Sequence, residues 1–480
     1  MKNVFFQHAA RLDERLTRRL RPLGAALALL LSALLALYNV SSGPLGNLND
    51  IGGWANRSLF IGMTAALQGG VLLAATWMHR GRFSRLLLRQ LALTFALLLM
   101  LMGINQKTYA YVQQVQPIVR AMDEGGLAAA FGFETPLSAP ALTLLYAVTR
   151  GPVYDMYLVK LLCIGCMLGL ALLAAHAADG IGAGMRAEAV LCLCLILPQG
   201  FLSAACAAQT DVAAALLLGL SLTLLCGKKR LPAAWLLFGV AAALSGAALY
   251  ALPVYACSLC RRESRPLYAA GAAATALLLC VPAMACGMPV GAALTSLLRA
   301  NFSLPPYAAG APNLMGLFPR AAMEEMPEYF MLRQVPALDP VTHATEYYTQ
   351  GHFTVLLRGI TLAGLALYIG LCALVRSRRD RSAIRQAFVL ALGALIVCPG
   401  VSMGAWLFLD VLCILAVVLA PALRLPACLV LFATAAGCCY PVTEEILLPT
   451  AAGFALCAVA LCMLLDIVPG AAGKKEGDRG

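Results

Sequence analysis

Long apolar segments separated by short polar connectors make up most of the chain. Each segment lasts about 15–23 residues and shows no alternation of apolar and polar positions. A helix needs about 20 apolar residues to cross a bilayer, whereas strands of membrane barrels are about 10 residues long and alternate. Only a helix satisfies its backbone groups within one such run. The pattern predicts an all-α integral membrane protein with about 12–14 transmembrane helices, from apolar segments at 23–40, 58–78, 86–104, 154–176, 187–203, 209–226, 231–244, 246–260, 267–285, 353–375, 385–401, 404–421, 426–440 and 445–467.

The segments 231–244 and 246–260 have two interpretations. They form either one long helix broken at Ser245-Gly246 or a short hairpin of two helices. Basic residues flank the pair on both sides, at Lys228–Arg230 and at Arg261–Arg265. Basic connectors stay in the cytoplasm, so these flanks favour the hairpin.

The composition supports a membrane location. The chain has 480 residues, of which 61% are hydrophobic and 12% charged, whereas soluble domains carry roughly 25% charged residues. Most of the 18 cysteines lie inside apolar runs. The pairs Cys163/Cys166 and Cys257/Cys260 lack the second pair or nearby histidines that a zinc site needs. We assign no metal ligands and no disulfide from this pattern, and a divalent metal is left as an unsupported alternative.

The basic residues indicate how the chain crosses the membrane. The formal net charge is +12, but the positive residues form short clusters between apolar segments instead of one basic face with interleaved aromatics. This distribution argues against nucleic-acid binding and is typical of a topology signal. It predicts a cytoplasmic amphipathic segment at 1–22, a transmembrane domain at 23–467 and a cytoplasmic tail at 468–480, in a bacterial plasma membrane. The clusters include Arg80/Arg82/Arg85/Arg89, Lys228/Lys229/Arg230, Arg376/Arg378/Arg379/Arg381/Arg385 and Lys474/Lys475/Arg479.

Three longer connectors are predicted on the outer face, at about 41–57, 105–153 and 286–352. In the second, Thr108 to Gly126 mixes polar and apolar residues and predicts an amphipathic helix on the membrane surface. The third contains many prolines and is expected to be irregular, with short helical pieces. Because ordered long loops are usually functional, we expect these connectors to enclose a site.

Carboxylates near helix ends are the first candidates for chemistry, because acids close to the bilayer interior are costly. Asp211 opens an apolar run after Gln209-Thr210, and Asp410 lies inside another. Asp211 also suits a helix N-terminus electrostatically, and Asp410 could simply bond to a neighbouring helix. In the outer connectors, Asp50 near Trp54 and Glu134 are candidate bases, with a solvated surface position as the alternative.

Basic residues of the predicted outer connectors and one lysine in an apolar segment complete the candidates for chemistry. Arg320 and Arg333, like Arg57 and Arg120, could neutralise a phosphate or could be surface charges. Lys160 begins a helix from the outer side and is expected to snorkel. The sequence has no phosphate-binding glycine loop and no hydrolytic triad order, so ATP-driven or soluble-type hydrolytic chemistry is not expected.

The order of several segments resembles the membrane glycosyltransferases of the GT-C superfamily, in particular bacterial relatives of GPI mannosyltransferase II and the protein O-mannosyltransferases. The similarity spans roughly residues 105–420. It rests on the proline-containing turn Leu195–Phe201, on Gln209-Thr210-Asp211 opening the next helix, on Pro253, on Val159-Lys160-Leu161-Leu162 and on Pro312–Phe318.

The resemblance implies an activity and a site. The implied activity transfers a sugar from a polyprenyl-phosphate donor to an outer-face glycan or protein acceptor. The lipid-linked donor and membrane lipid would then be partners. Asp50, Glu134 and Asp211 would be catalytic, and Gln209, Asn313, Arg320 and Arg333 would bind substrate.

Some family features are missing from this chain. The stretch that matches the family's acidic catalytic loop, Asn105–Tyr109, has no carboxylate, and Ser245 or Gly246 stands where a lysine is expected. Asp50 would supply the base in that case. A transporter or lipid-linked-glycan flippase, or a GT-C-like subunit without activity, are the alternatives.

Overall fold

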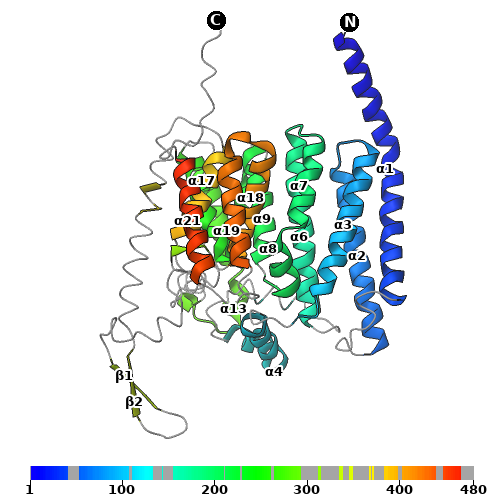
Figure 1. Cartoon of the computed structure of the whole chain (residues 1–480). Helices are drawn as coiled ribbons and strands as arrows, with labels where there is room; N and C mark the ends of the chain where they lie inside the picture. Colours follow the sequence, from blue (N-terminus) through cyan, green and yellow to red (C-terminus); the bar gives the residue numbers. More distant parts are fainter. Residues whose placement is uncertain are drawn as a thin grey trace, which may run out of the picture. The chain divides into compact units, whose positions relative to one another are not determined.

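The computed structural model of the chain consists mainly of helices (Figure 1). It describes residues 2–41, 53–106, 111–132, 155–209, 211–227, 230–260, 264–292, 383–397, 403–438 and 447–465, two short strands at 334–338 and 345–349, and positions 143, 147, 312–314, 367, 368, 370 and 371. The prediction of an all-α membrane protein is confirmed. Within the described ranges, six helices are long and apolar enough to cross a membrane, and one bent pair would make a seventh span. Five more apolar helices have 10–17 residues.

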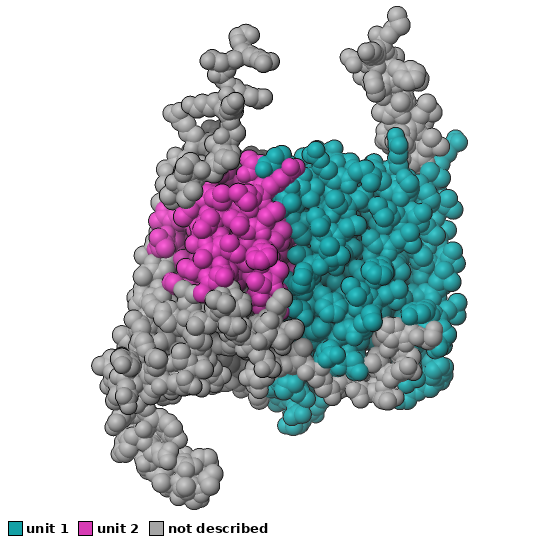
Figure 2. Space-filling view, in the orientation of Figure 1, with its two compact units in different colours: residues 1–248, 265–297, 414–421 teal, residues 249–264, 298–413, 422–480 magenta. Residues whose placement is uncertain are grey.

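The chain divides into two compact units, coloured separately in Figure 2. Unit 1 comprises residues 1–248, 265–297 and 414–421, and unit 2 comprises residues 249–264, 298–413 and 422–480. Each unit is described below by itself.

Unit 1 begins with three packed helices, α1 (Lys2–Ser41), α2 (Trp54–Met78) and α3 (Phe83–Gly103). Gln90 of α3 joins all three, because its Nε2 donates to the carbonyl oxygen of Gly24 at 2.9 Å and to Oγ1 of Thr76 at 3.1 Å. Gly24 has no side chain to separate α1 from α3: a Cβ there would lie 2.6 Å from Leu86 Cδ2. Helix α1 continues through Pro22, so the predicted amphipathic segment at 1–22 and the first apolar segment belong to one helix.

The connector at 105–153, predicted to be on the outer face, contains a π-helical turn, η2 (Tyr111–Val115), followed by α4 (Gln116–Gly132). The predicted amphipathic helix is present, with Ile118 and Met122 buried and Glu124 exposed. The helix is interrupted at Gly126, where it was predicted to end: Gly126 has a non-helical backbone with φ 72° and ψ −166°, and a second helical piece follows it to Gly132.

The centre of unit 1 is α6 (Asp155–Gly180), which packs against α2, α3, α7 (Met185–Leu195) and α9 (Asp211–Gly227). The segment predicted as one helix over 187–203 is bent by 52° between α7 and the piece formed by α8 (Pro198–Phe201) and the π-helical turn η3 (Leu202–Cys206). Pro198 has no N–H to continue the α7 hydrogen bonds, so the helix restarts there. The unit is completed by α10 (Leu231–Leu244), α12 (Pro266–Leu278) and α13 (Val281–Ala285).

The uncertain pair after residue 230 is broken at the expected place. Helix α10 ends at Leu244, and Ser245 has an extended backbone with φ −145° and ψ 128°. The chain resumes as the 3-10 turn η4 (Gly246–Ala251) and α11 (Leu252–Cys260).

Unit 2 contains α11, α17 (Ala383–Val397), most of α18 (Met403–Leu419), η7 (Pro421–Leu423), α19 (Arg424–Cys438) and α21 (Leu447–Leu464). Helices α19 and α21 pack along each other. Their backbones are close at Gly453 of α21, because a Cβ added there would lie 3.4 Å from the carbonyl oxygen of Ala433 in α19. The connector at 286–352 was predicted to be irregular, with short helical pieces. It also forms an antiparallel hairpin of β1 (Gln334–Leu338) and β2 (Thr345–Thr349).

Candidate functional site

Polar groups gather in unit 1 where α3 ends and α6 and α9 begin. Six residues, which we name the Lys160 cluster, come from four separate stretches of the chain. They are Asn105, Tyr157, Lys160, Gln209, Asp211 and Ser245. Each pair of neighbouring stretches is joined by a side-chain hydrogen bond, described below.

Lys160 is fully buried and fixes the end of α3. Its Nζ donates to the carbonyl oxygen of Ile104 at 2.9 Å and to that of Gln106. These carbonyls lie at the negative end of the α3 dipole, which favours a cation. The prediction that Lys160 snorkels toward water is wrong, because backbone carbonyls replace the water that its ammonium would otherwise seek.

Tyr157 lies one turn before Lys160 on α6 and contacts the same stretch. Its hydroxyl donates to Oδ1 of Asn105 at 2.8 Å, and its ring packs against Phe60 with centroids 5.6 Å apart. Residues 157 and 160 are three apart on a helix and therefore share one face. Together they hold the start of the 105–153 connector against α6.

Asp211 is the first residue of α9, and its Oδ1 accepts a hydrogen bond from the Ser245 hydroxyl at 2.6 Å. The carbonyl oxygen of Gln209 accepts a bond from the Cys163 thiol at 3.5 Å, which ties this turn to α6. The opposite charges of Asp211 and Lys160 both act on the Cys163 thiol. Asp211 and Lys160 thus both lie close enough to the buried Cys163 thiol to influence it.

The backbone before Asp211 is strained. Ala208 has φ 53° and is the one non-glycine residue with positive φ in the described part of the chain. It follows the π-helical turn η3 and precedes Gln209, whose N–H donates to the Ser203 carbonyl at 2.9 Å. Both π-helical turns and left-handed non-glycine residues occur preferentially at functional sites. Two independent backbone irregularities therefore mark the same turn.

The predicted site residues fall into three groups. Asp211 and Gln209 belong to the Lys160 cluster. Asn313 lies in unit 2, where its buried amide donates to the Leu395 carbonyl at 2.5 Å, and Asp410 is also in unit 2 and accepts a bond from Thr434 at 2.8 Å. Four further predicted residues lie outside the described residues: Asp50, Glu134, Arg320 and Arg333.

A second set of charges in unit 1 was not singled out from the sequence. Arg89 of α3 is fully buried and pairs with Glu188 of α7, Nε to Oε2 at 2.7 Å, and with Asp179 of α6. We name these three residues the buried charge cluster. In the sequence Arg89 resembles one more basic connector residue, and no local pattern links it to two acids about 90 positions away.

The described residues contain no group of three or more His, Cys, Asp or Glu side chains placed to hold a metal ion. The arrangement in the Lys160 cluster can accept a proton at Asp211 and present positive charge at Lys160. No protein-family model, no curated protein and no solved structure matches this chain. The geometry alone therefore carries the functional argument.

Proposed function

We propose that the protein is a membrane glycosyltransferase that takes a sugar from a polyprenyl-phosphate donor and glycosylates an acceptor during cell-envelope assembly. One observation carries this proposal. The stretches around residues 160 and 209–211, which suggested the resemblance to the GT-C superfamily, form one hydrogen-bonded polar cluster with residues 105 and 245, although these stretches are far apart in sequence.

The proposal includes an orientation. Both termini would lie in the cytoplasm, and the Lys160 cluster would lie near the outer face of a bacterial plasma membrane. The basic connectors at Arg80–Arg85 and Arg186 support this, because they lie at the opposite ends of α3 and α6 from the cluster. A lipid-linked donor displayed at the outer surface would then meet the cluster directly.

The proposed reaction is an inverting displacement. The carboxylate of Asp211 takes the proton of the acceptor hydroxyl as its oxygen forms a bond to the sugar C1. The bond from C1 to the phosphate oxygen breaks, and the polyprenyl phosphate leaves with its negative charge. Lys160, held by carbonyls near the same turn, would offset this charge, and Ser245 would orient the carboxylate. Asp50 and Glu134 stay predicted alternatives for the base.

Transfer from polyprenyl monophosphate mannose by the purified full-length chain tests the proposal. We expect Asp211→Asn to lower the transfer rate by about 10²–10⁴, as loss of a general base does. Asp410→Asn is the matched control, because it also neutralises a helix carboxylate with one hydroxyl partner but lies in unit 2. Equal rates for the wild type and Asp211→Asn would remove Asp211 from the site and, if Asp50→Asn is also unchanged, would remove the proposal.

A flippase is the second candidate, and the buried charge cluster favours it. Charged groups inside a spanning bundle commonly mark a path for a polar substrate. Movement of the labelled donor across liposomes without cleavage would support the flippase over the transferase.

A further inference from the structure

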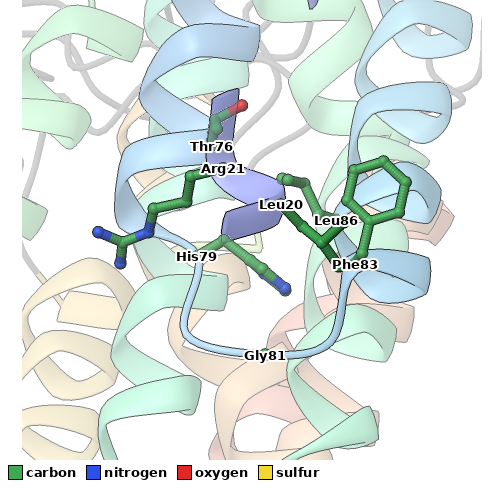
Figure 3. Close-up of a pocket in the computed structure, with 7 residues that line it drawn as sticks. All are labelled: Leu20, Arg21, Thr76, His79, Gly81, Phe83 and Leu86. Atoms are coloured by element: carbon green, nitrogen blue, oxygen red, sulfur yellow. The ribbon is translucent and has the colours of Figure 1, made fainter. Parts of the chain in front are cut away.

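The connector between α2 and α3 surrounds a small pocket that the proposed reaction does not use. Figure 3 shows the seven residues around it, with α1 on one side and the connector below. We name it the connector pocket. Its lining residues are Leu20, Arg21, Thr76, His79, Gly81, Phe83 and Leu86.

The pocket has fixed walls. Gln90 bonds to Gly24 of α1 and to Thr76 of α2, and Thr76 itself lines the pocket. Gly24 allows α1 to approach Leu86 closely, and Leu86 itself lines the pocket. Three helices therefore hold the pocket in shape.

His79 presents an acceptor to this pocket. The ring is buried, with 2% exposure, and its Nε2 lies 3.0 Å from the carbonyl oxygen of Arg82. A carbonyl only accepts, so Nε2 carries the proton and Nδ1 is the acceptor of a neutral ring. Burial, the largest influence, lowers the pKa of His79 below its ordinary value of 6.5, which keeps the ring neutral. Nδ1 is buried and has no hydrogen-bond partner among the described residues.

The surroundings of His79 are positive. Arg21 and Arg82 are exposed at the pocket, and the Arg85 guanidinium lies against Gly81, 2.5 Å from where a Cβ would be. The N-cap side chain of α3 makes no capping hydrogen bond, so the positive end of this 21-residue helix is available to an anion. The acid that acts on His79, Asp179, is paired with Arg89. An ammonium group would be repelled here, so the group that donates to Nδ1 is expected to be a hydroxyl on an anionic molecule.

The depth of the pocket indicates that this molecule is a lipid. Trp77, two residues before His79, is 83% exposed, and tryptophan is enriched at the membrane–water boundary. Large apolar side chains on the same three helices are exposed just beyond it: Leu23 at 54%, Leu73 at 39% and Leu88 at 42%. Acyl chains would cover these side chains while a head group sits at the level of the connector.

We propose that an anionic phospholipid with a hydroxyl-bearing head group, such as phosphatidylglycerol, binds at the mouth of the connector pocket, which itself has room for about one water-sized group. The phosphate contacts Arg21 and the N-terminus of α3, and a head-group hydroxyl donates to Nδ1 of His79. Basic pockets between membrane helices bind anionic head groups in this manner. The inference does not depend on the proposed transferase activity.

Lipid-dependent stabilisation of the purified full-length protein tests this site. Dioleoylphosphatidylglycerol is added to protein in a neutral detergent, and the apparent affinity is read from the rise in unfolding temperature. We expect Arg21→Ala to weaken this affinity by about fivefold, the effect of one arginine near a lipid phosphate. Arg19→Ala is the matched control, because Arg19 is exposed on the same helix but does not line the pocket. Equal affinities for the two variants would overturn the proposal.

Two lipid comparisons separate the parts of the site. Dioleoylphosphatidylmethanol is anionic but lacks the hydroxyl, so the wild type should bind it roughly two- to tenfold more weakly than phosphatidylglycerol. His79→Phe should abolish that preference. Dioleoylphosphatidylethanolamine stabilising as strongly as phosphatidylglycerol would contradict the role of charge. Saturation by free glycerol 1-phosphate at the same concentration as the lipid would show that the pocket binds a soluble phosphate and not a lipid.

Discussion

At the scale of single residues, the most costly feature of unit 1 is a fully buried arginine. Arg89 uses Nε and Nη2 to hold Glu188 and Asp179, so the helices α3, α6 and α7 share one charge network. A buried pair stabilises little compared with an apolar core, but removing one partner leaves an uncompensated charge. Arg89 therefore matters for the fold mainly because its two acids cannot stay buried without it.

Arg89→Met should lower the free energy of unfolding by about 3–5 kcal/mol, since it leaves two carboxylates buried without a cation. Arg186→Met is the control, because Arg186 is exposed at the start of α7. Unfolding temperatures in detergent would measure both. Adding Glu188→Gln and Asp179→Asn to Arg89→Met should recover part of the loss. No recovery would mean that the arginine acts through packing alone.

Single residues also show that side-chain partners on different helices cannot be predicted from the sequence. Asp211 was found because an acid that opens an apolar run is unusual, but its partner Ser245 lies 34 positions away and no periodic pattern connects them. Lys160 was noticed and its environment was misjudged, because burial against the Ile104 and Gln106 carbonyls depends on how α3 and α6 pack. Side-chain networks between helices are set by tertiary contacts and are not visible in local sequence.

At the scale of elements, small residues decide how closely helices approach. A Cβ on Gly239 of α10 would lie 2.3 Å from the carbonyl oxygen of Ala272 in α12. A Cβ on Gly271, one residue before Ala272, would meet only Leu236 Cδ2 at 3.7 Å, an ordinary contact. Small residues at such crossings allow backbones to pack directly in membranes.

Gly239→Ala should destabilise the protein by about 1–3 kcal/mol, because α10 and α12 must move apart to admit the methyl group. Gly271→Ala changes the neighbouring glycine by the same methyl group and should have little effect. Thermal unfolding of the two variants in the same detergent would compare them. Similar losses of stability for the two variants would show that the close approach of α10 and α12 at Gly239 does not cause the effect.

Most helix positions could be predicted because an apolar run of spanning length has few other stable forms. Helices α2, α3, α6 and α9 begin or end within a few residues of the predicted segments. The features that were missed are irregular ones. The bend at Pro198 and the π-helical turns η2 and η3 depend on local hydrogen bonds that hydrophobic periodicity does not record.

At the scale of the whole molecule, the open question is which end of the bundle faces the cell interior. In unit 1 the connectors at 79–82 and 181–184 lie at the same end of the helices, and α4 follows the other end of α3 (Figure 1). The basic residues around the first connector predict that this end is cytoplasmic.

Reporter fusions would test that orientation. Fusions after residues 82 and 182 should report a cytoplasmic location, and a fusion after residue 125 should report the opposite side. The prediction extends to the later connectors, where residues 286–352 should lie on the opposite side of the membrane from residues 376–385. If 125 and 182 report the same side, the outer-face site proposed for the Lys160 cluster fails, while the lipid pocket is unaffected.

The first helix has a consequence of its own. Helix α1 has 40 residues, so at 1.5 Å per residue it is about 60 Å long, roughly twice the thickness of the hydrocarbon layer. The candidate span Arg19–Ser41 is already long enough to cross the membrane, so the part of α1 before Arg19 is not needed for the crossing. Because Leu20 and Arg21 line the connector pocket, a partner that binds this N-terminal part of α1 would act next to the proposed lipid site.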